Sequence, residues 1–101
     1  MALDYAWEQY HAAVRILATS TGSLQDRLHD SYESRLHRVV PAEDLPAPLG
    51  GRHTAIMGRL DERVSAQLSD DDAASVATEI VDLYHGIINR QAHPEDYKDE
   101  A

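Results

Sequence analysis

SDDDAASVATEIVDLYHGIINRQ, residues 69–91, is the stretch of this sequence that decides the fold. Its apolar residues return every three or four positions, which places them on one face of an α-helix. Ser69 is a preferred N-cap residue, and Asp72 stands three residues later, where a carboxylate completes a capping box and faces the positive end of the helix dipole. The stretch therefore predicts a long amphipathic helix that begins sharply after Ser69.

Three earlier stretches show the same spacing, and two of them have a start signal. Asp4 is a serviceable N-cap for the first, and Ser23 with Asp26 three residues later forms a second capping box. No run alternates apolar and polar residues for long enough to form a strand. We therefore expect an all-α fold, a single-domain bundle within residues 1–92 whose four helices cover about 4–18, 23–40, 49–67 and 69–91.

A Pro/Gly-rich crossover, PAEDLPAPLGG at residues 41–51, separates the second and third helices. Its three prolines preclude a continuous helix, although a single turn starting at Pro41 is allowed. The Gly50–Gly51 pair is expected to end this crossover. Beyond the last helix, residues 93–101 are polar and acidic, and we expect them to form a frayed, flexible tail.

The composition limits where and how the protein works. Its 101 residues suffice for one core, and the absence of cysteine excludes disulfides, thiolate zinc sites and cysteine nucleophiles. The net charge of −9, from 18 acidic and 9 basic residues, repels nucleic acid and anionic lipid. No apolar run is long enough to cross a bilayer, and the first residues lack the basic region of a secretory leader. We therefore expect a cytoplasmic protein that contacts neither nucleic acid nor membrane directly, and the preference for Arg over Lys suggests a GC-rich bacterial genome.

The first helix predicts an interface because apolar residues lie on two of its sides. Behind the main stripe, which runs through Trp7, Tyr10 and Val14, lies a second line formed by Tyr5, Ala12 and Ile16. One interpretation is that this second line covers loops of the same chain. The other, which we favour, is that it meets another subunit, most simply a second copy in a symmetric dimer. The predicted interface is Tyr5, Ala12 and Ile16, flanked by Trp7 and Tyr10 if the core is shallow.

Histidine and carboxylate side chains offer a first possible metal site on the second helix. His29, Glu33 and His37 follow one another at four-residue intervals. Adjacent pairs would supply two ligands to zinc, whereas a tight site needs three or four ligands in a closed geometry. We interpret these three residues as part of a solvated helix face.

Two further pairs, Glu8–His11 and Asp82–His85, have the carboxylate-x-x-His spacing that di-metal helical bundles use. Their positions relative to the apolar stripes point them away from a shared interior. We therefore expect no metal and no other cofactor.

Arg52, Arg59 and Arg63 line one edge of the third helix. The ordinary explanation is ion pairing with carboxylates of neighbouring helices, and the alternative is a strip that docks an acidic partner segment or a phosphate. His53 falls near the apolar line of the same helix. We expect it to be half-buried with a backbone or carboxylate partner, and the alternative is a pH-responsive contact.

The sequence contains no catalytic signature, neither a Gly-x-Ser-x-Gly turn nor a phosphate-binding P-loop. We therefore expect a non-enzymatic helical protein-interaction module, an accessory or regulatory subunit that acts through homo- or hetero-oligomeric contact. Its partner is expected to be a second copy of the chain or a larger complex. The alternative is an acidic inhibitor, of the antitoxin, immunity or nucleic-acid-mimic kind, that occludes a basic surface of a target protein. A metal-dependent helical-bundle enzyme is the least favoured hypothesis.

Overall fold

The structure is a computed structural model, and it describes residues 2–61 and 67–100. Within these residues the chain forms helices and no strand, which confirms the predicted all-α fold. The α-helices are α1 (Ala2–Thr19), α2 (Leu24–Ser34), α3 (Pro41–Asp44), α4 (Ala47–Leu60) and α6 (Asp70–Ala92). Short 3-10 helices follow α2 and α6, namely η1 (Leu36–Arg38) and η2 (Pro94–Tyr97).

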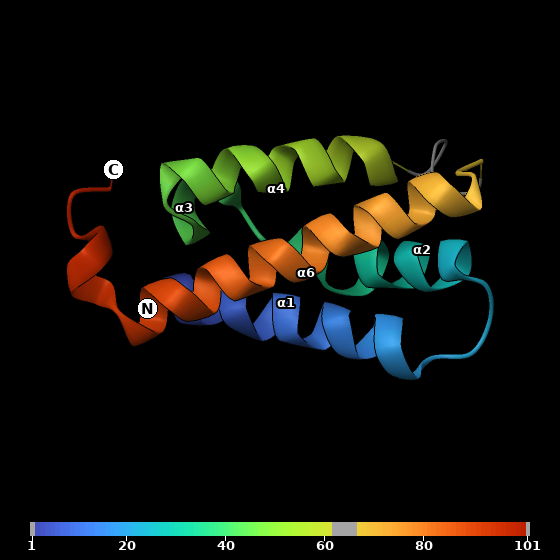
Figure 1. The fold of residues 1–101 in the computed structure, drawn as a ribbon, viewed down its shortest axis with the longest axis horizontal. Coiled ribbons are helices and arrows are strands. Elements are labelled where there is room, and N and C mark those ends of the chain that lie inside the picture. Colours follow the sequence, from blue (N-terminus) through green and yellow to red (C-terminus); the bar gives the residue numbers. More distant parts are fainter. Residues whose placement is uncertain (1, 62–66, 101) are drawn as a thin grey trace.

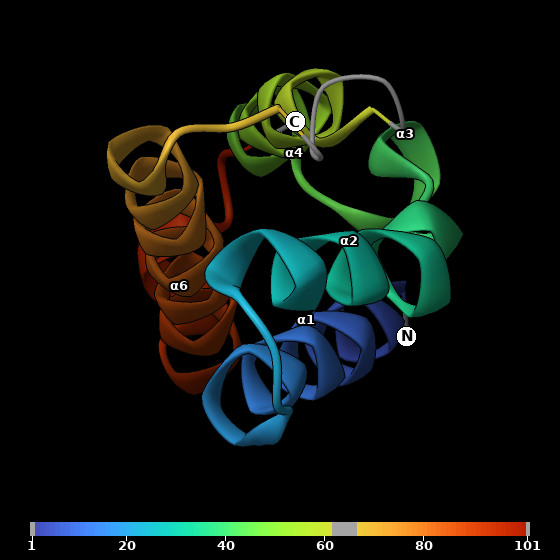
Figure 2. The same ribbon diagram turned by 90° about the vertical axis from the view of Figure 1, so that its right-hand side faces the viewer.

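Helix α6 packs against three others, α1, α2 and α4. It runs beside α1 in the opposite direction along the 40 Å length of the molecule (Figure 1). Seen along that length, α1, α2, α4 and α6 surround a common centre, and α3 lies beside α4 (Figure 2). None of the helices in the described ranges combines the length and the apolar content that crossing a bilayer requires.

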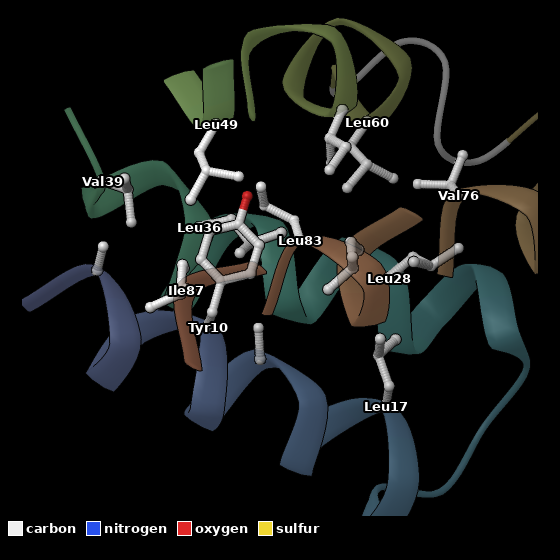
Figure 3. Close-up of a cluster of buried hydrophobic side chains, with 14 of the residues drawn as sticks. Tyr10, Leu17, Leu28, Leu36, Val39, Leu49, Leu60, Val76, Leu83 and Ile87 are labelled. Atoms are coloured by element: carbon white, nitrogen blue, oxygen red, sulfur yellow. The ribbon is translucent and has the colours of Figure 1, made fainter. Parts of the chain in front are cut away.

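The centre of the bundle is filled by side chains from every long helix. Figure 3 shows the Tyr10 ring rising from α1 into this cluster, toward Leu49 of α4. Around it lie fully buried apolar residues that include Leu28, Leu36, Ile56, Leu60, Val76, Ile80, Leu83 and Ile87. The removal of these side chains from water is the main force that holds the four helices together.

Both predicted serine starts are confirmed. The Ser23 hydroxyl accepts a hydrogen bond from the backbone N–H of Asp26 at 3.0 Å, and Ser69 accepts one from Asp72 at 3.1 Å. Each serine therefore satisfies one of the N–H groups that the first turn of a helix leaves without an intrahelical partner. The start of α1 differs from the prediction: the helix begins at Ala2, and Asp4 lies in its first turn.

The second helix is shorter than predicted, because it ends at Ser34 and not near residue 40. Side chains spaced four apart rotate by about 40° around a helix at each step, so a straight helix would carry Leu36 away from the face of Leu28. The turn at Arg35 and the 3-10 helix η1 bring the chain back toward the core, so that Leu36 and Val39 are buried. Burial of these two side chains explains the break.

The crossover also departs from the prediction. The single turn at Pro41 forms as α3, but α4 already begins at Ala47, so Gly50 and Gly51 lie inside a helix and do not end the crossover. A Cβ at Gly50 would stand 3.2 Å from the carbonyl oxygen of Pro41, so the missing side chain lets α3 and α4 approach closely.

At its other end α4 stops at Leu60, because the backbone of Asp61 leaves the helical conformation. The prediction continued this helix to about residue 67, and residues 62–66 of that prediction lie outside the described residues.

The C-terminal segment is held on α6 in the structure, where the sequence predicted a frayed tail. Arg90 donates two hydrogen bonds of 2.7 Å to the two carboxylate oxygens of Glu100, and its guanidinium lies 4.3 Å from the centre of the Tyr97 ring. The hydrogen bond from Arg90 lowers the pKa of Glu100, and the same bond raises the pKa of Arg90. An ion pair and a cation–π contact therefore hold this segment against α6.

Candidate functional site

A buried tyrosine–histidine pair joins α1 to α4. The Tyr10 hydroxyl lies 2.6 Å from His53 Nδ1, and the two rings meet edge to face with centroids 5.7 Å apart. The side chains are 0% and 1% exposed. Because a solute has no access to groups this deeply buried, the pair acts as a structural tie between helices.

Burial decides the protonation of this pair. Removal from water lowers the pKa of His53 to about 4, against the opposing influence of a hydrogen bond with the Val39 backbone and of the Asp44 carboxylate. Burial likewise raises the pKa of Tyr10, against a smaller effect of Arg52. At neutral pH the imidazole is uncharged and the phenol is protonated, so the hydroxyl donates to Nδ1.

These positions test two sequence predictions. Tyr10 was placed on the main apolar stripe of the first helix, and at an interface only if the core were shallow; it lies at the centre of the core, so the interface alternative is wrong. His53 was expected to be half-buried, and it is fully buried. Its backbone partner was predicted correctly, but the tyrosine was missed, since 43 residues separate the two in the chain.

The core-facing line of α1 is rotated from the predicted stripe. Its fully or almost fully buried residues are Ala6, Tyr10, Ala13 and Leu17. Trp7 and Val14, which the prediction placed in that stripe, are half-buried on the side that faces α6. Because α1 lies between α2 and α6, part of its apolar surface on both sides meets its own chain.

On the α2 side of α1, the Ser31 hydroxyl donates to the Ala13 carbonyl at 3.2 Å.

The predicted interface residues Ala12 and Ile16 are half-buried, and Tyr5 is 39% exposed. An interface at Tyr5, Ala12 and Ile16 stays a prediction, with Tyr5 as its most exposed large side chain.

The side of α1 that faces α6 carries an aromatic cluster. The Trp7 and His11 rings are stacked, with centroids 4.7 Å apart and planes 13° from parallel. His11 Nδ1 lies 2.7 Å from the Tyr84 hydroxyl of α6, and the Trp7 and Tyr84 rings are 6.4 Å apart. His11 is therefore bound to an aromatic neighbour on α6, a contact that the sequence analysis did not predict.

A groove continues along the same boundary, which we call the α1/α6 seam and define by Trp7, His11, Val14, Tyr84 and Val81. The groove is open to solvent and has a volume of about 380 Å³ near the C-terminal end of α1. Six apolar side chains and two polar ones line it: Val14, Leu17, Ala18, Leu24, Ala77, Thr78, Val81 and Asp82. The seam thus offers solvent-accessible apolar surface from two antiparallel helices, beside a cluster of aromatic rings.

The predicted histidine–carboxylate face of α2 is not continuous. His29 Nε2 lies 3.6 Å from Glu33, but the helix ends at Ser34, so His37 belongs to η1 and its ring faces Tyr32. Among the side chains that the structure describes, no group of three or more His, Cys, Asp or Glu residues is placed to hold a metal ion.

The arginines that the sequence places along one edge of the third helix have different surroundings. Arg59 donates to Glu79 of α6 at 2.8 Å, which is the ion pairing that the ordinary explanation predicts. Arg52 is exposed and, with Glu79, borders a cavity of about 210 Å³. Arg63 lies outside the described residues.

Comparison with known protein families, with curated proteins and with solved structures finds no match to this chain.

Proposed function

We propose that this chain is a non-enzymatic protein-interaction module, an accessory or regulatory subunit that docks on a protein partner through the α1/α6 seam. The groove beside the Trp7–His11–Tyr84 cluster is the observation that carries the proposal. Protein interfaces typically bury an apolar centre with aromatic anchors inside a polar rim. The seam has these parts in one place.

The positions of the reactive side chains support an interaction role over catalysis. His53 and Tyr10 are buried against each other, and Arg59 is paired with Glu79. A general base has to reach a proton of its substrate. The titrating groups of the core are enclosed, while the seam presents mainly apolar and aromatic surface.

A matched pair of variants tests the proposal. Ala18 and Ala92 are both exposed near the C-terminal end of a helix, but only Ala18 lines the groove. Cross-linking of tagged protein in the cells that encode it is expected to give one recurrent adduct, either with a second copy or with another protein. Ala18→Arg is expected to remove that adduct, and Ala92→Arg to leave it intact.

The same experiment contradicts the proposal if Ala18→Arg and Ala92→Arg give the wild-type adduct in equal yield. Ile16→Arg then tests the other predicted face, because an interface at Tyr5, Ala12 and Ile16 would lose the adduct with that change. Fractionation of the cells checks the cytoplasmic location that we propose from the sequence.

An acidic inhibitor is the second candidate function, and one observation favours it. Asp70, Asp71 and Asp72 are all exposed in the first turn of α6. Such carboxylates would attract a basic target surface at long range, with an affinity that falls steeply as salt rises. Reversal of Asp70 and Asp71 to lysine would abolish target binding if this function is correct, and would leave the cross-linked adduct unchanged if the seam alone carries the contact.

A further inference from the structure

We propose that the partner segment that occupies the α1/α6 seam is a basic amphipathic helix of another protein. This inference rests on the proposed function and adds the chemistry of the partner. Two features of the seam carry it, the shape of the groove and the sign of the charge at its edges.

The groove lies between two antiparallel helices, an arrangement that can receive a third helix. Most of its lining comes from α1 (Val14, Leu17, Ala18) and α6 (Ala77, Thr78, Val81, Asp82), and Leu24 of α2 adds to it. An amphipathic helix binds such a groove by inserting apolar residues at i, i+3, i+4 and i+7. Trp7 and Tyr84 extend the apolar surface beyond the groove, along the same direction.

The edges of the seam are negatively charged. Asp82, on the α6 edge, lines the groove itself. On α1 the exposed acidic residues of the outer edge are Asp4, whose carboxylate binds Gln91 across the seam, and Glu8. Three carboxylates therefore border the seam.

Arg15 is the exposed guanidinium of this edge among the residues that the structure describes, so the carboxylates outnumber the basic groups there. Lysine and arginine residues on the flanks of a bound helix would face these carboxylates.

Charge argues against a second copy at this surface. Each chain has a net charge of −9, and two seams brought together would place their acidic edges against each other. Like charges that face each other across an interface oppose association. A partner of opposite sign removes this repulsion and gains attraction, so the seam fits a basic helix better than another copy of the chain.

Two synthetic helical peptides test the inference on the full-length protein. Both present leucines at i, i+3, i+4 and i+7 and lack tryptophan, and their flanking positions are all lysine in one and all glutamate in the other. Because the chain has one tryptophan and it lies on the seam, Trp7 emission reports binding there. The lysine peptide is expected to bind about tenfold or more tightly than the glutamate peptide, and its affinity is expected to fall as salt rises.

Charge and groove variants locate the binding. Asp82→Lys is expected to weaken the lysine peptide by about fivefold or more, whereas Asp96→Lys, the same change at an exposed position of η2, is expected to have little effect. Ala18→Arg is expected to weaken both peptides, and Ala92→Arg neither. The four positions are exposed, and circular dichroism confirms that each variant is folded; Asp82→Asn replaces Asp82→Lys if that variant is not.

Three peptide-binding outcomes overturn the inference, and one sedimentation outcome does so as well. The peptide-binding outcomes are equal binding of the two peptides, binding of neither, or equal weakening by Asp82→Lys and Asp96→Lys. A chain that sediments as a dimer, and as a monomer after Ala18→Arg, also overturns it, because a second copy then occupies the seam. The proposed function is judged separately, since it stands or falls on whether Ala18→Arg removes the cellular adduct.

Discussion

In the part of the chain that the structure describes, two hydrogen-bonded histidine–tyrosine pairs join α-helices, and they differ in where they lie. His53 and Tyr10 meet at 2.6 Å in the centre of the core, between α4 and α1. His11 and Tyr84 meet at 2.7 Å on the α1/α6 seam, where both side chains are only partly buried. The chemical groups and the distance are nearly the same in the two pairs.

The comparison indicates that burial, rather than the chemical groups in the pair, determines how much each pair contributes to stability. A hydrogen-bonding group that loses its partner in the core is left without water, at a cost of about 1–3 kcal/mol. On the seam, water replaces the lost hydrogen-bond partner, so the cost is smaller. We therefore expect the His53–Tyr10 pair to contribute more to stability than the His11–Tyr84 pair, which lies on the surface that we propose as the docking site.

The largest expected effect on stability comes from replacing His53 with alanine, and the same replacement at His11 is its comparison. His53→Ala leaves a cavity and a buried tyrosine hydroxyl without its acceptor, and we expect it to lower the free energy of unfolding by about 2–4 kcal/mol. His11→Ala is expected to lower it by less than about 1 kcal/mol. Urea denaturation followed by circular dichroism measures both, and equal losses for the two variants would contradict the comparison.

Lowering the pH also tests the contribution of His53 to stability. The pKa of His53 is about 4 in the folded protein and about 6.5 in an unfolded chain. Between these values the unfolded chain binds a proton that the native protein does not, so stability falls as the pH is lowered from about 6.5 toward 4. The full contribution is on the order of 3 kcal/mol. In His53→Gln this contribution is absent, so its stability should approach that of the wild type as the pH falls; parallel pH profiles would show that His53 is not the group responsible.

Removal of a single hydroxyl is a milder test of the same idea. Tyr10→Phe leaves the buried His53 Nδ1 without a donor and is expected to cost about 1–2 kcal/mol. Tyr84→Phe is expected to cost less than about 0.5 kcal/mol, since water reaches His11. Thermal melts of the two variants compare the pairs, and a larger loss in Tyr84→Phe would reverse their order.

The smallest effect is spectroscopic. His11→Ala removes the ring stacked on Trp7 and exposes more of the indole to water, so we expect the emission maximum to move to longer wavelength with little change in stability. His53→Gln, measured at neutral pH where it is folded, is expected to leave the emission unchanged. A shift in His53→Gln and none in His11→Ala would mean that the seam and the core are not independent.

The fold class was predictable from the sequence, but the seam was not. The helical spacing of apolar residues and the two Ser-x-x-Asp starts were enough to predict an α-helical bundle. The stripe assigned to α1 was rotated, because Trp7 and Val14 fit an apolar line as well as the smaller Ala6 and Ala13 do. Spacing alone does not show which neighbour lies on which side of a helix.

The hydrogen bonds of Ser23 and Ser69 join groups three residues apart, so the order of residues is sufficient to establish them, and the same holds for the turn at Pro41. Contacts between distant segments were decided by packing. His53 finds Tyr10 across 43 residues, and His11 finds Tyr84 across 73, once the helices are side by side. Burial then made one pair part of the core and left the other on the seam, because the number of neighbouring helices around a side chain exists only in the folded chain.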